Sequence, residues 1–243
     1  MNKENRTNIQ DQHFRIDLAM QCISQERVTK IIMDYLPSGM VHKEAEFHII
    51  TDHLGRNWLI INNNDGTLTL STPLFAYEDM DEFLYIANEL LEQGAQGGEL
   101  CGMRFFASLK DHMPRALVNL RNILATKTPI LKKVLKSIDK EESMGKVLDD
   151  KGTVEVFPFA VANDLDPNEM KACIQLGCAM VTQAINQNRV NTTSATHYEN
   201  ERYAFRCWML RMGLIGDEYK MCRSRLMARV EGDSAQRTRR KPV

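Results

Sequence analysis

The sequence lacks an excess of charge of either sign. Its 243 residues include 31 lysines and arginines against 32 aspartates and glutamates, so the formal net charge is −1. A chain with such balanced charge produces no global field that would attract nucleic acid or an anionic membrane. The sequence also has no internal repeat and no low-complexity tract, which argues against a repeat protein.

Paired cysteines and long apolar runs are absent as well. The six cysteines include no C-x-x-C pair, and Cys173 and Cys178 would lie about 140° apart around a helix, too far for a metal clamp. We interpret all six as reduced thiols. The first residues, MNKENRTNIQDQ, are polar and carry no secretory signal, and no apolar run approaches the ~18 residues of a membrane span. We therefore expect a cytoplasmic protein without a membrane partner.

The sequence does contain regular strand and helix patterns. Its hydrophobic content of 43% and charged content of 26% are those of a globular domain that buries a core. Alternating apolar residues bounded by turn signals predict strands, and apolar residues at helical spacing predict helices. The predicted strands are residues 13–20, 45–53, 57–63, 66–72, 101–108 and 153–161. The predicted helices are residues 23–36, 77–98, 114–138, 166–187 and 198–230.

Individual residues refine these boundaries. Ser24 is placed to cap the first helix. Pro129 is expected to break or kink the third helix, and Gly213 and Gly216 to break the last one. Pro158 suits an edge strand or a bulge better than a central strand. Residues 139–152 have the composition of a charged linker.

The order of these elements predicts an α+β protein. We expect an antiparallel sheet with helices packed on one face, followed by a helical C-terminal extension. The predicted units are a polar leader over 1–13, an α+β domain over 14–190, a helical extension over 191–235 and a basic tail over 236–243.

Four segments of the α+β domain carry motifs in a familiar order. They are HFRIDLAMQCISQERVTKII, GRNWLIINNNDGTLTLSTPL, LLEQGAQGGELCGMRFFAS and GTVEVFPF. In turn they resemble an opening strand with an E-x-E pair, a W-x-V…D-G-S-L…E-L-V-(S/T)-P hairpin, a C-G-h-H-h-H strand (h, apolar) and a T-V-E-F-R strand. The domain is therefore similar to the amidoligase family. These are ATP-dependent carboxylate–amine ligases of glutamine-synthetase-like fold, common in phages and mobile elements.

The resemblance implies an active site on one face of the sheet, and most of its polar positions are replaced in this chain. The histidines of the family fall at Arg104 and Phe106, and the arginine of T-V-E-F-R falls at Phe157. Two further family glutamates fall at Ala19 and Thr69. The acids that are retained or shortened are Asp17, Asp65 and Glu155. The scaffold-type residues Trp58, Pro73, Cys101, Gly102 and Thr153 are kept.

Ligation of this kind needs carboxylates to hold Mg²⁺ and a basic residue to balance the charge of the transferred phosphoryl group. The resemblance makes Asp17, Arg104 and Glu155 the candidate catalytic residues. It makes Asp17 and Glu155 the candidate metal ligands, and Asp65 and Arg104 the candidate ATP-binding residues. Because the other polar positions are replaced, we expect a catalytically impaired member of the family. Such a protein would act by binding a protein partner, either an active paralogue or a substrate protein.

Two alternatives stay open. The chain could be a still-active ligase that uses Mg²⁺ and ATP, with Asp17, Asp65 and Glu155 around one ion. It could also be an unrelated α+β interaction module whose basic tail contacts nucleic acid weakly. We expect no nucleic-acid partner, because the basic residues at the C-terminus are not interleaved with aromatic residues.

Three other groups of residues favour structural roles. His48 and His53 would face opposite sides of a strand, which makes them a poor metal pair. The asparagines at 62–64 fit a hairpin turn, because Asn tolerates positive φ. The aromatic residues of YAFRCWML over 203–210 are expected to be buried in packing.

Overall fold

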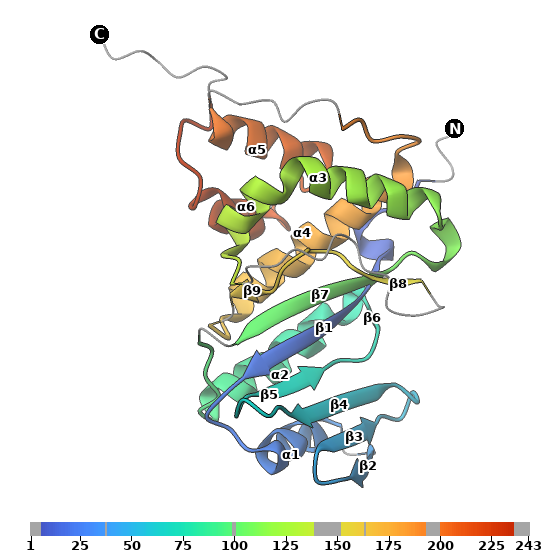
Figure 1. Ribbon diagram of the computed structural model, residues 1–243, viewed down its shortest axis with the longest axis vertical. Helices are drawn as coiled ribbons and strands as arrows, with labels where there is room; N and C mark the ends of the chain where they lie inside the picture. The colour runs from blue at the N-terminus through green and yellow to red at the C-terminus, as the bar shows by residue number, and fades with distance from the viewer. Residues whose placement is uncertain are drawn as a thin grey trace.

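A nine-stranded antiparallel sheet runs through the part of the chain that the structure describes (Figure 1). This computed structural model describes residues 6–36, 38–98, 101–138, 152–162, 164–192 and 200–235. The strand order is β2-β3-β4-β5-β1-β7-β8, with β6 paired to β1 and β9 paired to β7. The strands are β1 (His13–Met20), β2 (Met40–Lys43), β3 (Phe47–Thr51), β4 (Asn57–Asn62), β5 (Leu68–Ser71), β6 (Phe75–Ala76), β7 (Gly102–Ser108), β8 (Thr153–Glu155) and β9 (Val161–Ala162).

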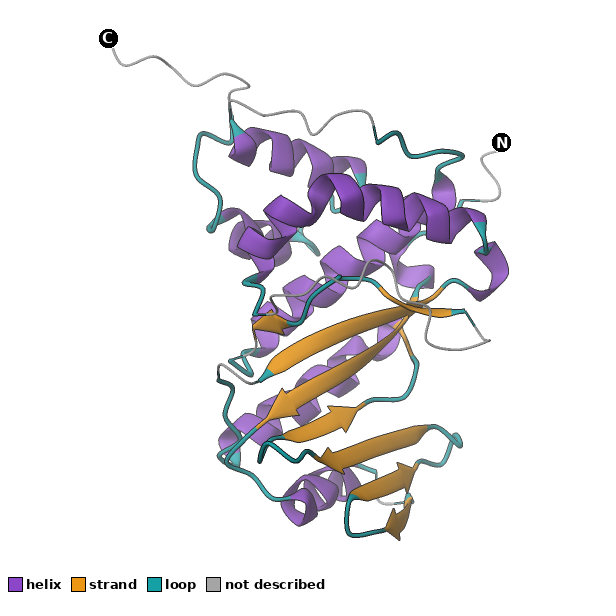
Figure 2. Cartoon of the chain, viewed as in Figure 1, coloured by secondary structure: helices purple, strands orange, loops and turns teal. Residues whose placement is uncertain are grey.

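Helices cover one face of this sheet, so the predicted α+β class is confirmed (Figure 2). The helices behind the sheet are α1 (Gln25–Tyr35), α2 (Met80–Glu92) and α4 (Pro167–Asn186). A second layer packs on α4 and consists of α3 (Arg115–Leu135), α5 (Glu201–Arg211) and α6 (Lys220–Met227). Short 3-10 helices are η2 (Ile9–Asp11), η3 (Tyr77–Asp79) and η4 (Lys110–His112).

The alternation of β1 decides which side of the sheet meets the helices. Phe14, Ile16 and Leu18 are completely buried, whereas Arg15 and Asp17 between them are partly exposed. Successive side chains of a strand point to opposite faces, so one face of β1 is apolar and the other carries charge. The apolar face is the one that packs against helices.

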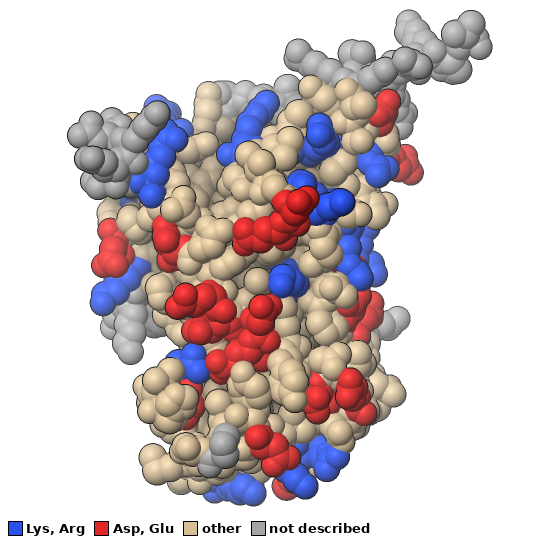
Figure 3. All heavy atoms as spheres, turned by 180° about the vertical axis from the view of Figure 1, so that it is seen from behind, with Lys and Arg blue, Asp and Glu red and all other residues tan. Residues whose placement is uncertain are grey.

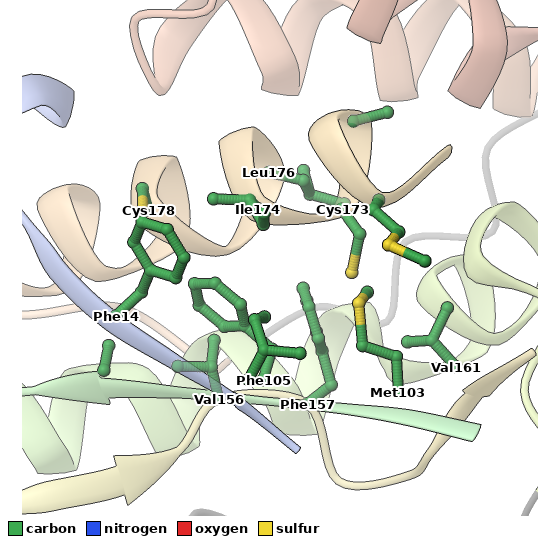
Figure 4. Close-up of a cluster of buried hydrophobic side chains, with 14 of the residues drawn as sticks. Phe14, Met103, Phe105, Val156, Phe157, Val161, Cys173, Ile174, Leu176 and Cys178 are labelled. Atoms are coloured by element: carbon green, nitrogen blue, oxygen red, sulfur yellow. The ribbon is translucent and has the colours of Figure 1, made fainter. Parts of the chain in front are cut away.

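A close contact between the sheet and the helices that cover it joins β7 to α4. Phe105 of β7 lies under Gly177 of α4, and a Cβ atom at position 177 would overlap the Phe105 ring. The Phe105 ring also lies 6.0 Å from the ring of Phe14 and 5.7 Å from that of Phe157. Figure 4 shows these aromatic rings pointing from the sheet toward α4. The missing side chain at Gly177 therefore allows the helix to rest directly on the aromatic cluster.

One predicted strand is wrong in its extent. Pro129 was expected to break or kink its helix; α3 continues through this position without a break, with Leu124 and Leu131 buried on either side. The predicted strand over 153–161 is two short strands, β8 and β9, separated by an irregular stretch that contains Pro158. Strand β2 was not predicted, because its residues are largely exposed and show no alternation of buried and exposed side chains.

The C-terminal helices belong to the same hydrophobic core as the sheet. Phe205, Trp208 and Leu226 are buried in that core, as expected for Phe205 and Trp208, whereas Tyr203 is only partly buried. The predicted break between α5 and α6 is confirmed, with φ of +96° at Gly213 and +92° at Gly216. The predicted linker at 139–152 and the basic tail at 236–243 lie outside the described residues, except for Gly152.

None of the helices in the described ranges is long and apolar enough to span a bilayer. All six cysteines are unbonded, and burial raises the pKa values of the Cys173, Cys178 and Cys222 thiols. These buried thiols are therefore protonated at neutral pH.

Candidate functional site

The sheet face turned away from the helices carries most of the polar residues picked out by the sequence motifs. We call it the open face. Its central residues are Arg15, Asp17 and Ala19 of β1, Thr69 and Ser71 of β5, Arg104 and Phe106 of β7, and Glu155 of β8.

Strand register brings the predicted site residues together. Asp17 lies opposite Arg104, Ala19 lies opposite Thr69, and Phe106 lies opposite Glu155. Directly opposed residues on adjacent strands have Cβ atoms about 4.5–5.5 Å apart. The predicted catalytic residues Asp17, Arg104 and Glu155 thus share one small area of the sheet.

Two arginine–carboxylate pairs occupy this area. Arg104 Nη1 donates to Glu155 Oε1 at 2.5 Å, and Glu155 is only 3% exposed. Arg15 Nη2 donates to Asp17 Oδ2 at 3.1 Å. The guanidinium carbon of Arg15 lies 4.8 Å from the centre of the Phe106 ring, a cation–π contact. Arg15 therefore pairs with Asp17 and at the same time covers the ring of Phe106.

Each member of the Arg15–Asp17 pair also keeps one buried polar atom without a partner. Within the described residues, neither Arg15 Nε nor Asp17 Oδ1 has a hydrogen-bond partner. Leaving a buried donor or acceptor unsatisfied costs about 1–3 kcal/mol. Native proteins contain few such atoms, so two on neighbouring side chains mark this part of the face as a candidate site.

Arg15 was missed by the motif comparison, although the sequence contained a signal for it. It precedes Asp17 by two residues in a strand with alternating burial, so the two side chains share a face. Only the cross-strand position of Phe106, however, explains why the Arg15 side chain lies flat on the sheet.

Phe157 does not lie on the open face, although the resemblance places it at an active-site position of the family. Strand β8 ends at Glu155, and the chain bends over the next four residues. This bend interrupts the alternation, so the Phe157 ring turns to the helix side and joins Phe105 and Phe159. Of the two predicted aromatic replacements, only Phe106 lies on the open face.

Asp65 lies in the hairpin turn between β4 and β5. Its Oδ1 accepts hydrogen bonds from the backbone N–H and the hydroxyl of Thr67, and these bonds lower the pKa of Asp65. Gly66 beside it has φ of +82°, as the predicted turn requires. The carboxylate of Asp65 is therefore used to build the turn.

The open face does not fit a Mg²⁺ ion held by Asp17 and Glu155. Mg²⁺ demands about six oxygen ligands in octahedral geometry, and each of these carboxylates already accepts a hydrogen bond from a guanidinium. The described residues contain no group of three acidic, histidine or cysteine side chains placed to hold a metal. We derive no catalytic step through a metal here.

The remaining predicted residues have structural partners. His48 is buried under α1, where its Nδ1 lies 2.7 Å from Thr29 Oγ1, and His53 is exposed in the turn after β3. Arg225 and Arg229, from the basic C-terminal run, both pair with Glu169. These two arginines are therefore engaged within the protein.

The two sides of the sheet differ in charge. Seen from the helix side, acidic side chains gather over the middle of the molecule (Figure 3), where η3 and the start of α2 carry Glu78, Asp79, Asp81 and Glu82. On the open face, two arginines accompany two acids. The central charges of the open face are thus balanced and paired.

The chain matches no family model, and no curated protein matches it. The amidoligase resemblance therefore rests on the four motifs and on the positions their residues occupy.

Proposed function

We propose that this chain is an amidoligase-like protein, of phage or mobile-element type, that has lost ligation and acts by binding a protein partner in the cytoplasm. The single observation that carries the proposal is that the two retained acids on the open face pair with arginines, Asp17 with Arg15 and Glu155 with Arg104. A glutamine-synthetase-like arrangement of the sheet is part of the same proposal.

The physical argument concerns what the family reaction requires. Each guanidinium occupies one oxygen of its carboxylate and places a positive charge beside it, which disfavours a divalent cation at the same position. Phe106 stands where the family has a histidine, and a phenyl ring ligates neither a metal nor a phosphate. Arg104 can bind phosphate through its planar fork, but it is directed at Glu155. These contacts favour a binding role over catalysis.

Calorimetry with ATP and MgCl₂ tests the loss of ligation. We expect no Mg²⁺-dependent ATP binding in the micromolar range. The double variant Arg104→His/Phe106→His restores the two histidines of the family motif and is expected to gain such binding. The control is Phe47→His/Ile49→His, which places two histidines at the same spacing on the open face, but on β3. Micromolar Mg²⁺-dependent binding by the unmodified chain would refute the proposal.

The proposed partner is tested with purified proteins. An amidoligase that carries intact E-x-E and H-h-H strands is mixed with this chain and run through size-exclusion chromatography with light scattering. We expect a mixed complex that is weakened by Arg104→Glu and retained by Arg121→Glu, a change on α3. Failure of the two proteins to co-elute would exclude an active paralogue as the partner.

One observation favours the alternative of retained ligase activity. Asp17, Arg104 and Glu155 share the open face, and Asp17 Oδ1 has no partner within the described residues. The alternative requires ATP turnover that depends on Mg²⁺, an amine and a carboxylate. That turnover would be abolished by Asp17→Asn and unaffected by Asp65→Asn.

A further inference from the structure

A groove lies at the end of the open face, where β1 begins and β7 ends. Its volume is about 640 Å³, and its walls come from the loop between β5 and β6, the end of β7 and the start of η4. Sites for small organic ligands commonly measure about 300–1,000 Å³. The groove is therefore large enough for a small molecule.

The charged side chains that line the groove are all cations. They are Arg15, Arg56 and Lys110, and no acid lines it within the described residues. Arg56 is already engaged, because its Nε donates to Asp52 Oδ2 at 2.6 Å and its Nη2 to Glu82 Oε1 at 3.1 Å. These acids neutralise the charge of Arg56, so its guanidinium lines the groove but is not free to bind a ligand.

The hydrogen-bond donors left for a ligand come from three residues. Lys110 is exposed and has no ion-pair or hydrogen-bond partner within the described ranges. Ser108 follows Phe106 by two residues on β7, so its hydroxyl faces the same side as the ring. The Arg15 side chain is 33% exposed and, among the described residues, donates only through its Nη2, to Asp17, so its Nη1 is left for a ligand.

The groove also has an apolar side. Pro73 and Leu74 line it, and Leu74 is 42% exposed, so its side chain is accessible from the groove. A ligand that suits this groove therefore carries a negative group for the donors and an apolar body for the loop.

We propose that this groove binds a small oxyanion, either a carboxylate or a phosphate ester, attached to an apolar group. Lys110, Ser108 and Arg15 bind the oxyanion, and Leu74 contacts the body. The proposal goes beyond the function proposed above, because it requires neither Mg²⁺ nor a relation to the amidoligases.

A second groove in the molecule illustrates why the charges of the first one matter. It lies between α1 and α2, has a volume of about 270 Å³ and is lined by Arg27 and Lys30 together with Asp34 and Glu89. Because cations and anions are balanced there, that groove has no preference for an anion. The second groove therefore serves as a control for anion binding in the first.

The experiment compares three probes with one aromatic ring. Benzoate and phenyl phosphate carry the two candidate oxyanions, and benzyl alcohol carries none. Binding is measured without Mg²⁺ by calorimetry and by NMR shifts of backbone amides near Ser108. We expect one or both anions to bind and benzyl alcohol to bind at least tenfold more weakly. The anion that binds more tightly identifies the carboxylate or the phosphate ester as the natural group.

Variants locate the site. Removing a charged donor from an anion is expected to weaken binding about tenfold in Lys110→Gln, and removing a neutral hydroxyl about threefold in Ser108→Ala. Lys30→Gln, in the second groove, is the matched control and should bind like the unmodified chain. The proposal is overturned if neither anion binds, if benzyl alcohol binds equally well, or if both groove variants keep full affinity.

Discussion

Phe105 and Phe106 are adjacent residues of the same type, and their surroundings differ in kind. Phe105 is 0% exposed and Phe106 is 3% exposed, so burial alone does not distinguish them. Phe105 lies between aromatic rings and α4, whereas Phe106 is covered by the guanidinium of Arg15. One face of β7 is thus a packed core, and the other is an aromatic ring beneath an ion pair that can rearrange.

The largest expected effect comes from removing the ring on the helix side. Phe105→Ala leaves a cavity among rigid neighbours and should lower the free energy of unfolding by about 3–5 kcal/mol. Phe106→Ala should cost less than half as much, because water and the Arg15 side chain can occupy the space. Urea unfolding of both variants measures the difference. Equal losses would mean that the open face is packed as tightly as the core.

The next effect tests the contact between β7 and α4. Gly177→Ala forces a methyl group onto the Phe105 ring and should destabilise the protein by about 1–3 kcal/mol, in spite of the better helix propensity of alanine. Adding Phe105→Leu should recover part of this loss, since the smaller side chain makes room. A loss in the double variant that equals the sum of the single losses would contradict direct contact.

An effect of similar size is expected on the open face. Arg104→Gln leaves the buried Glu155 carboxylate without its guanidinium and should cost about 1–3 kcal/mol. Glu155→Gln should cost less, because Arg104 is exposed enough to be solvated. The double variant Arg104→Gln/Glu155→Gln completes the cycle by urea unfolding. A coupling energy near zero would mean that the pair does not form in solution.

The smallest effect depends on pH and arises on the helix side of β3. Burial lowers the pKa of His48 below its ordinary value, and the nearby Lys43 adds to this shift. Below about pH 6.5 the unfolded chain therefore binds more protons than the folded one, and the free energy of unfolding falls as the pH falls. His48→Gln should reduce this slope between pH 7 and 5, and His53→Gln should leave it unchanged. An identical slope in both variants would assign the effect to other groups.

The sequence predicted the helix side of the sheet better than the open side. Alternation in β1, the Ser24 cap and the glycine break before α6 are local features, and each was recovered from neighbouring residues alone. The turn of Phe157 to the helix side was not recovered, because it depends on where β8 leaves β7. A break at Pro129 does not occur, because tertiary packing of α3 outweighs the loss of one hydrogen bond.

The sequence predicted which residues form the candidate site, but not which of them pair with one another. The motifs selected Asp17, Arg104 and Glu155, and strand register does bring them together. The position of Arg15 over Phe106 depends on a cross-strand alignment that one-dimensional patterns do not contain. The same limit applies to the groove, whose residues come from five separate stretches of the chain.

The contact between Gly177 and Phe105 also predicts how the protein tolerates mutation. Position 177 accepts no side chain without displacing a ring, so changes at Phe105 and Gly177 are restricted to coordinated pairs. Arg104 and Phe106, which face the other way, are not restricted by any helix. A saturation library along β7 should therefore show tolerance with a period of two residues, and the open face is where new binding properties can be acquired without loss of the fold.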